Sequence, residues 1–216
     1  MRVLVTGAGG QLGGELQRTA PPEVLLAVPG RAELDITDAR AVQTFSATFR
    51  PDWIINAAGY TAVDRAESEP QRVREINAGA VRNLAQAADA QDARLVQIST
   101  DFVFDGAQGR PYRTSDATNP LSVYASSKLE GEQIAAEMLG SRALIVRTSW
   151  MYAARGHNFV RTMLRLMQER DSLGVVADQV GTPTSASGLA RSSSSCAPCS
   201  SHWPAGRGHR NSGRIR

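Results

Sequence analysis

Short apolar runs alternate with helical patterns over the first 190 residues of the chain. Apolar runs rich in β-branched residues predict five strands, at residues 2–6, 24–28, 53–56, 95–99 and 143–147. Helical periodicity predicts helices at residues 11–19, 38–49, 70–90, 124–139 and 158–170. Runs such as Val3-Leu4-Val5 show little polar alternation, which is typical of strands buried on both faces. The order of the elements predicts an α/β fold, a Rossmann-like doubly wound parallel sheet.

The regular pattern stops near Arg191, and a mixture of Ser, Gly, Arg, His and Pro follows. Such a composition lacks the apolar residues needed for a core, so we expect disorder or poorly packed coil from about Ser192. The predicted organisation has three parts. They are a dinucleotide-binding Rossmann domain with catalytic residues over 1–150, an incomplete C-terminal substrate lobe over 151–191, and a disordered or aberrant tail over 192–216.

The charge of the chain is unevenly distributed. The 216 residues have a formal net charge of +3 and a pI near 9.2. Residues 192–216 contain four arginines and no acidic residue, so residues 1–191 carry a net charge of −1. The high pI is therefore weak evidence for nucleic-acid binding, and we expect none. No apolar run approaches the ~18 residues that a membrane helix needs. The N-terminus enters a strand without a secretory leader pattern, which predicts a cytosolic location.

Glycines Gly7, Gly10 and Gly13 lie between the first strand and the first helix. In a dinucleotide site the first allows a tight turn, the second a close approach of the pyrophosphate, and the third close packing of the helix. The helix N-terminus then presents free N–H groups to the phosphates. The strict spacing fails because Leu12 occupies the last position. A glycine-rich turn without a ligand is the alternative, but its place directly after the first strand favours binding.

The second strand ends at Val28-Pro29-Gly30-Arg31 and offers no acid for a ribose 2′-hydroxyl. Arg31 could instead meet a 2′-phosphate, which indicates NADPH, with NADH as a second cofactor. A solvated loop arginine is an equally good interpretation. Small residues after the third strand, Ala57, Ala58 and Gly59, would let a nucleotide lie against the backbone at the carboxyl edge of the sheet.

Tyr124 and Lys128 have the i,i+4 spacing that places two side chains on one face of a helix. An ammonium group beside a phenol stabilises the phenolate and lowers the Tyr pKa from about 10. Tyr124 could then serve as an acid or base near neutral pH. A surface Tyr/Lys pair is the alternative. A hydroxyl at Ser99 or Thr100, at the end of the fourth strand, could hold a substrate carbonyl beside the phenol.

These motifs together resemble the extended short-chain dehydrogenase/reductase superfamily and, within it, the dTDP-4-dehydrorhamnose reductase family. The resemblance covers about residues 1–191. It is carried by residues 7–17, NAAGYTAVDRAE at 56–67, STDFVFDG at 99–106, NPLSVYASSKLEG at 119–131, RTSWMY at 147–152, residues 158–170 and DQVGTPT at 178–184.

The resemblance implies a role for individual residues. Tyr124 would protonate the C4 oxygen of the sugar as hydride arrives from the nicotinamide. Lys128 would anchor the nicotinamide ribose and lower the Tyr124 pKa, and Thr100 would be the catalytic hydroxyl. Asp101 and Trp150 match substrate-contacting positions, with Thr100 and Tyr124 beside them, although a Trp directly after a strand can also be a core residue. The cofactor contacts would be Gly7, Gly10, Gln11, Leu12, Gly13, Arg31, Asp35, Ile36, Ala57, Ala58, Gly59, Tyr60, Thr61, Tyr124 and Lys128.

The implied reaction is the NADPH- or NADH-dependent reduction of dTDP-4-dehydro-L-rhamnose to dTDP-L-rhamnose, a precursor of cell-surface polysaccharide. A homodimer is the expected assembly, with no membrane partner. Two alternatives stay open. One is another sugar-nucleotide epimerase or dehydratase of the superfamily, although dehydratases add an acidic pair after the hydroxyl where this chain has Asp101 and then Phe102. The other is a non-catalytic regulatory subunit of the methionine adenosyltransferase type.

The change of character after Arg191 is the main departure from the family, whose members continue well past the proline-threonine motif. A truncation or frameshift near residue 191 is the expected cause. We therefore expect weak binding of the dTDP-sugar, or apolar surface left exposed where the missing lobe would cover it. Cys196 and Cys199 have C-x-x-C spacing but no strand–helix context, so incidental cysteines are favoured over a zinc or redox site, and no metal site is expected.

Overall fold

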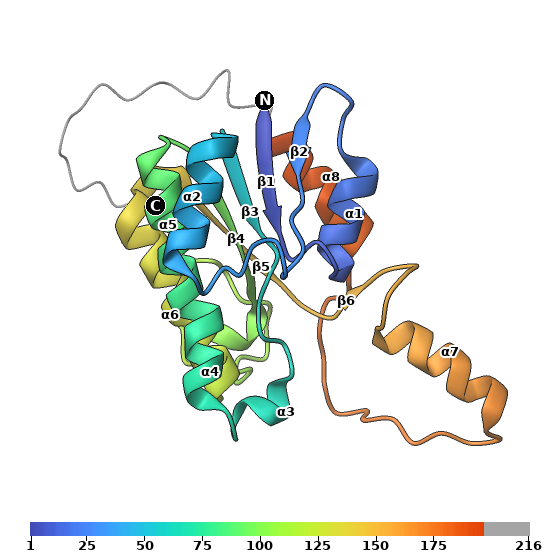
Figure 1. Cartoon of the computed structure of the whole chain (residues 1–216). Helices are drawn as coiled ribbons and strands as arrows, with labels where there is room; N and C mark the ends of the chain where they lie inside the picture. The colour runs from blue at the N-terminus through green and yellow to red at the C-terminus, as the bar shows by residue number, and fades with distance from the viewer. Residues whose placement is uncertain (197–216) are drawn as a thin grey trace.

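The computed structural model describes residues 1–196, which form a five-stranded parallel sheet flanked by helices (Figure 1). The strands follow the order β2-β1-β3-β4-β5, and every neighbouring pair is parallel. Their bounds are β1 Arg2–Thr6, β2 Leu25–Ala27, β3 Trp53–Asn56, β4 Arg94–Thr100 and β5 Ala143–Thr148. The predicted α/β class and all five predicted strands are confirmed, and no strand end differs from its prediction by more than one residue.

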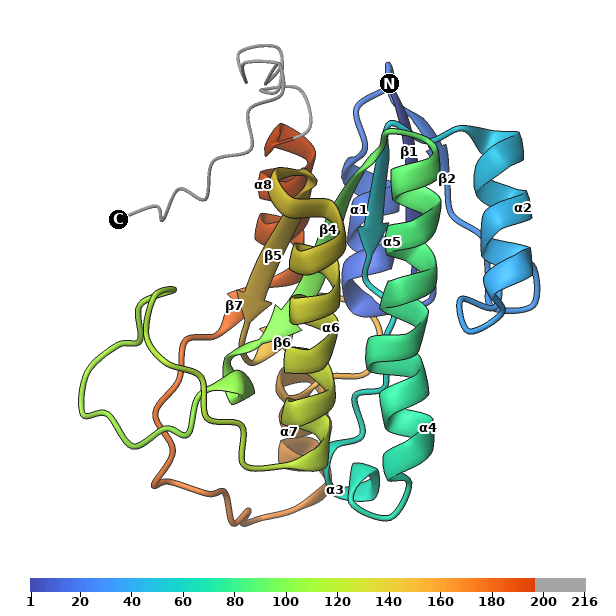
Figure 2. The same cartoon turned by 90° about the vertical axis from the view of Figure 1, so that its left-hand side faces the viewer.

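Helices cover both faces of the sheet. On one face lie α2 (Ala39–Phe49), α5 (Ala80–Ala90) and α6 (Val123–Leu139), and on the other lie α1 (Gln11–Thr19) and α8 (Ala186–Cys196) (Figures 1 and 2). The alternation of side chains along β1 feeds both layers: Leu4 packs with the first group and Val5 with the second. Burial of both sheet faces explains why the strand sequences lack polar alternation.

The helix predicted over residues 70–90 contains an irregular turn. It comprises α4 (Pro70–Arg74), a π-helical segment η1 (Glu75–Gly79) and α5. π-turns inside helices occur frequently at functional sites. Here the turn carries Asn77, which is buried and faces α6, and Gly131 of α6 leaves room for the backbone of Asn77. Any larger residue at 131 would push the two helices apart.

Side-chain caps fix the starts of three predicted helices. Asp38 accepts hydrogen bonds from the first turn of α2, Ser122 accepts from the backbone N–H of Ala125 in α6, and Asn158 caps α7 (Phe159–Glu169). Such caps satisfy N–H groups that have no partner within the helix. Smaller elements were not predicted: α3 (Val63–Ala66), the 3-10 turns η2 (Asp101–Val103) and η3 (Gly140–Arg142), and a separate two-stranded parallel sheet of β6 (Met151–Tyr152) and β7 (Thr184–Ser185).

Helix α8 corrects one expectation about the tail. Disorder was expected from about Ser192, but the helix continues to Cys196. Its alanines Ala186 and Ala190 are fully buried, and Ala190 belongs to the same core cluster as Leu16 of α1. Small residues at i,i+4 spacing let α8 lie close to α1, and this packing overrides the weak apolar pattern. The rest of the predicted tail, including Cys199, lies outside the described residues.

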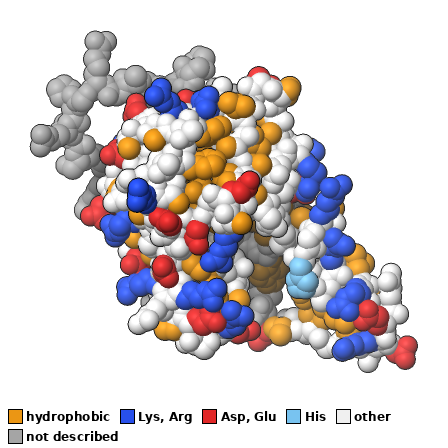
Figure 3. Space-filling view, viewed as in Figure 1, with side chains coloured by type: hydrophobic (Ala, Val, Ile, Leu, Met, Phe, Trp, Pro, Cys, Tyr) orange, Lys and Arg blue, Asp and Glu red, His pale blue; other side chains and the backbone are white. Residues whose placement is uncertain are grey.

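Helix α7 stands away from the body on an extended arm (Figure 1). None of its residues is buried, and four large apolar side chains are exposed: Phe159, Val160, Leu164 and Met167. Figure 3 shows apolar side chains on this arm and a hollow between the arm and the body. The expected exposed apolar surface is therefore present, and α7 carries it. Within residues 1–196, no helix has the length and apolar character needed to cross a membrane.

Candidate active site

A cavity of about 490 Å³ opens at the carboxyl ends of β1 and β3, which is where open parallel sheets bind ligands. It holds most residues that the sequence predicted as cofactor contacts. The predicted residues in its wall are Gly7, Gly10, Arg31, Asp35, Ile36, Ala57, Ala58, Gly59 and Tyr60. Gln11, Leu12, Gly13 and Thr61 are not in the wall, and Leu12 lies in the core beneath it, so their predicted contacts stay predictions.

The glycine turn at the floor of the cavity requires residues without side chains. Gly7 has φ +76°, and a Cβ built on it would lie 2.5 Å from the carbonyl carbon of Ala57. The turn is closed by a hydrogen bond of 2.9 Å from the Gly10 N–H to the Gly7 carbonyl. Gly10 then caps α1, whose first N–H groups point out of the turn. The loop therefore offers backbone donors and a helix N-terminus to an anionic group.

Two arginines line the cavity. Arg31, predicted to meet a 2′-phosphate, has a largely exposed side chain and lies 3.7 Å from the Asp35 carboxylate. Arg72 of α4 is the second, and its guanidinium lies 3.7 Å from the carboxylate of Glu69. Sequence reasoning missed Arg72 because nothing in the helical pattern distinguishes it from the other arginines of that helix.

Thr100, Tyr124 and Lys128 come together beside this cavity. Thr100 ends β4, and its hydroxyl lies close enough to the Tyr124 side chain, in the first turn of α6, to lower the pKa of the phenol. The same hydroxyl accepts a 3.2 Å hydrogen bond from the N–H of Phe102. Ser99 was the other candidate hydroxyl, and its Oγ is buried with no partner among the described residues. The Thr100 hydroxyl is thus the one that acts on Tyr124, and its catalytic role stays a prediction.

The Lys128 ammonium group lies beside the wall of the cavity. Its Nζ donates to the backbone carbonyl of Ile98 at 2.6 Å, and it lies 3.7 Å from the position of a Cβ built on Gly59, which lines the cavity. Burial lowers the pKa of Lys128 to about 8, against a raising effect of Glu132. Glu132 is itself paired with Arg147 at 2.6 Å, which moderates that effect.

The expected lowering of the Tyr124 pKa is not found. Burial of the phenol raises the pKa of Tyr124, the hydrogen bond from Thr100 opposes this, and the charge of Asp101 adds to the rise. The expectation was wrong for this state because Lys128 directs its charge to the Ile98 carbonyl rather than to the phenol. Tyr124 is thus protonated at neutral pH, as a proton donor must be.

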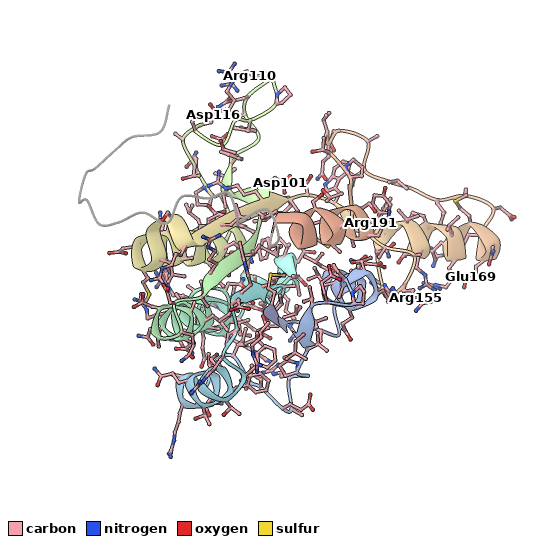
Figure 4. All side chains as sticks on the ribbon, turned by 90° about the horizontal axis from the view of Figure 1, so that it is seen from above. Asp101, Arg110, Asp116, Arg155, Glu169 and Arg191 are labelled. Atoms are coloured by element: carbon pink, nitrogen blue, oxygen red, sulfur yellow. The ribbon has the colours of Figure 1, made fainter. Side chains whose placement is uncertain are left out.

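Asp101 and Trp150, the predicted substrate contacts, lie at the ends of β4 and β5. Burial raises the pKa of Asp101, whose carboxylate accepts from the Thr100 hydroxyl at 3.2 Å. In Figure 4 Asp101 lies near the base of a projecting loop whose tip carries the Arg110–Asp116 ion pair. Trp150 has φ +44° and an exposed ring in contact with Gly181. It is therefore not a core residue, and its substrate contact stays a prediction.

Asn77 is a further site residue that the sequence did not reveal. Its Oδ1 accepts from the Tyr60 N–H at 2.8 Å, and its Nδ2 donates to the Ser127 hydroxyl at 3.0 Å. One side chain in the π-turn thereby ties the loop after β3 to the helix that carries Tyr124. Among residues 1–196, no cluster of three or more His, Cys, Asp or Glu side chains could hold a metal ion.

Comparisons with known proteins show that the chain matches one protein family. The profile of the RmlD substrate binding domain matches residues 1–205. The dTDP-4-dehydrorhamnose reductases of Streptomyces griseus and Aggregatibacter actinomycetemcomitans are 47% and 45% identical to the chain, over 88% and 85% of its length. The chain covers only 62% and 63% of those two relatives.

Solved structures of dTDP-4-dehydrorhamnose reductases also match the chain. The chain matches a dTDP-4-dehydrorhamnose reductase from Clostridium acetobutylicum with a TM-score of 0.89 and 42% identity, over 93% of this chain and 71% of that one. It also matches the Bacillus anthracis reductase in complex with NADP, with a TM-score of 0.88 and 42% identity, over 90% of this chain and 69% of that one.

Proposed function

Because the chain belongs to the RmlD substrate binding domain family, we propose that it is an NAD(P)H-dependent reductase of a dTDP-4-keto sugar. The substrate would be dTDP-4-dehydro-L-rhamnose and the product dTDP-L-rhamnose. The observation that carries the proposal is the constellation of Thr100, Tyr124 and Lys128 beside the nucleotide cavity. A homodimer in the cytosol, with no nucleic-acid or membrane partner, belongs to the same proposal.

The cavity suits a dinucleotide. Its glycine turn leaves no room for a Cβ at Gly7, and its backbone donors and helix N-terminus match a pyrophosphate. The two arginines, Arg31 and Arg72, provide positive charge at the cavity wall, which supports NADPH as the cofactor. The cofactor would supply the hydride for C4 of the sugar. Lys128, beside Gly59, would hold the nicotinamide ribose.

Residues of the chain would supply the proton that the reduction needs. In the reduction, hydride adds to the C4 carbonyl carbon, the C=O π bond breaks, and the oxygen takes a proton from the Tyr124 phenol. Thr100 would donate a hydrogen bond to the same oxygen as charge develops on it. The raised pKa of Tyr124 ensures that the proton is present beforehand. Tyr124 then recovers a proton from solvent.

The two alternatives have less support. A dehydratase would need a second acid after Asp101, where the structure has the Phe102 ring packed edge-on against Tyr124, with 6.1 Å between ring centroids. A regulatory subunit would not need Thr100 beside Tyr124 or the buried Lys128. No residue of the site favours either alternative over reduction.

The exposed arm bears on how well the sugar would bind. The residues that would hold the cofactor lie in the five-stranded body, whereas the arm with α7 and the Trp150 segment exposes its apolar side chains. We therefore propose that the cofactor binds more strongly than the dTDP-sugar. Fluorescence titration with NADPH, and separately with dTDP, would measure both affinities.

One assay tests the function. The purified chain receives dTDP-4-dehydro-L-rhamnose and NADPH, and oxidation of NADPH is followed at 340 nm for wild type, Tyr124→Phe and the control Tyr112→Phe. Tyr112 lies in the projecting loop, where its hydroxyl binds Asp105. We expect turnover in wild type and control and a loss of at least ~100-fold in Tyr124→Phe. Equal turnover in all three, or none in wild type despite NADPH binding, would refute the proposal for this chain.

A further inference from the structure

Three buried polar side chains form a row across the centre of the sheet, at paired positions of three neighbouring strands. Thr6 of β1 pairs with Asn56 of β3, and Asn56 pairs with Gln97 of β4. All three are at most 2% exposed, and they share a sheet face with the apolar residues Leu4, Ile54 and Leu95. Buried polar groups are costly unless they are paired, so a row of three in the core needs a complete set of partners.

Hydrogen bonds connect this row to Lys128. Thr6 Oγ1 donates to Asn56 Oδ1 at 2.6 Å, and Asn56 Nδ2 donates to Gln97 Oε1 at 2.8 Å. Gln97 Nε2 then donates to the Ile98 carbonyl at 2.9 Å, and the Lys128 ammonium group donates to the same oxygen at 2.6 Å. Gln97 and Lys128 therefore donate hydrogen bonds to the same carbonyl oxygen. Asn56 Oδ1 also accepts from the N–H of Ala58, in the cavity wall.

Lys128 is the only lysine in the sequence. Its buried head group has few charged neighbours: Glu132 lies one turn further along α6 and is paired with Arg147 of β5, and Asp101 at the end of β4 acts on Tyr124. The remaining groups described around the ammonium are neutral, namely the Ile98 carbonyl and the backbone of Gly59. The placement of the ammonium thus depends on the position of one carbonyl.

We propose that Gln97 is a positioning residue for Lys128. Its amide group holds the Ile98 carbonyl, and that carbonyl aims the ammonium at the Gly59 edge of the cavity. This inference rests on the proposed function, in which the ammonium group would bind the nicotinamide ribose at that edge. The placement itself is a property of the chain without any ligand, and it can be tested in that state.

The chemistry of an amide separates positioning from simple packing. If Gln97 only satisfied Asn56, any acceptor of the same shape would serve, and glutamate would keep that hydrogen bond. A glutamate, however, loses the N–H that holds the Ile98 carbonyl and brings a carboxylate next to the ammonium. An opposite charge within about 4–6 Å shifts a pKa by about 1–3 units toward the charged form.

The experiment uses the full chain labelled with [ε-¹³C]lysine, which gives one signal because there is one lysine. The signal is titrated with pH in wild type, Gln97→Glu and the control Leu95→Ala, which removes a buried apolar group from the same face of β4. We expect the midpoint of Lys128 to rise by at least about one unit in Gln97→Glu. It should stay within 0.3 units of wild type in the control, a margin of about the precision of the titration. A folded Gln97→Glu chain with the wild-type midpoint would overturn the proposal.

A second variant covers the case in which Gln97→Glu does not fold. Gln97→Met keeps the length of the side chain and removes the amide, and the rate at which an amine-specific acylating reagent modifies Lys128 is measured by peptide mass spectrometry. We expect at least roughly threefold faster modification than in Leu95→Ala, because the Ile98 carbonyl that binds the lysine is no longer held by an amide. Equal rates in two variants of equal thermal stability would overturn the proposal. Neither measurement needs cofactor or sugar, so a chain that fails to oxidise NADPH would refute the reductase proposal and leave this result standing.

Discussion

The hydroxyl of Thr100 acts on the phenol of Tyr124 and opposes the rise of its pKa, although β4 and α6 are separated in sequence by the projecting loop. Two proton-bearing side chains thus lie near each other at the edge of the sheet. Asp101, on the other side of Thr100, orients the threonine hydroxyl through a 3.2 Å hydrogen bond. This pair is the part of the site that a reacting carbonyl would meet.

We expect Thr100→Val to reduce kcat by about 10²-fold, because the variant keeps the shape of the side chain and removes a donor to the developing negative charge. KM should change much less. Steady-state rates of NADPH oxidation measure both constants. The control is Ser99→Ala, which removes the adjacent hydroxyl, for which residues 1–196 offer no hydrogen-bond partner. A Thr100→Val chain as active as Ser99→Ala would remove Thr100 from the mechanism.

The pKa of Lys128 predicts a pH dependence of stability. The folded-state pKa is about 8 and the ordinary value 10.5, so the unfolded chain binds more protons between these values. Stability contributed by this group is therefore lowest below pH 8 and rises toward pH 10.5. Lys128→Met should remove a rise of about 2 kcal/mol in the free energy of unfolding. Urea titrations at pH 7 and 9.5 measure it, and equal slopes with pH in both proteins would contradict the prediction.

Gly7→Ala should abolish NADPH binding and destabilise the fold by about 2 kcal/mol or more. The variant forces a Cβ into the backbone of Ala57 and into an unfavourable positive φ. Gly14→Ala, in α1 outside the cavity wall and with only ordinary contacts for an added Cβ, is the matched control. Thermal melts and fluorescence titration measure both effects. Wild-type binding by Gly7→Ala would show that the cavity does not hold the pyrophosphate.

The arginines of the cavity predict cofactor preference. Arg31→Ala and Arg72→Ala should each lower the ratio of NADPH to NADH affinity by about tenfold, because hydrogen bonds to a charged group contribute about 1.5–3 kcal/mol. The loss should shrink at high salt, since both side chains are more than half exposed. Arg82→Ala, exposed on α5, is the control. An unchanged ratio would remove that arginine from the recognition of the 2′-phosphate.

Much of the body could be predicted from the sequence because periodicity and burial coincide there. The runs at β1 and β3 are largely apolar and their strands are buried on both faces, and capping residues such as Asp38 mark helix starts. Tyr124 and Lys128 were also predictable, since one helical turn fixes their relation.

The remaining features depend on tertiary contacts that leave no local pattern. The π-turn around Asn77, the approach of Arg72 to the cavity and the packing of α8 on α1 all arise between elements far apart in sequence. The Tyr124 pKa was wrongly expected to fall for the same reason. Spacing along α6 brings the two side chains to one face, but only the fold shows that the Ile98 carbonyl takes the lysine charge.

The contact of α8 with α1 also has a consequence for biosynthesis. Leu16 lies near the start of the chain and Ala190 near the end of the described part, yet both belong to one apolar cluster on one face of the sheet. A growing chain must therefore leave the part of this sheet face and of α1 that α8 covers exposed until residue 190 has emerged from the ribosome. Contacts of such long sequence separation form late and slow folding. The exposed sheet face on the nascent chain is the kind of surface that chaperones protect from aggregation.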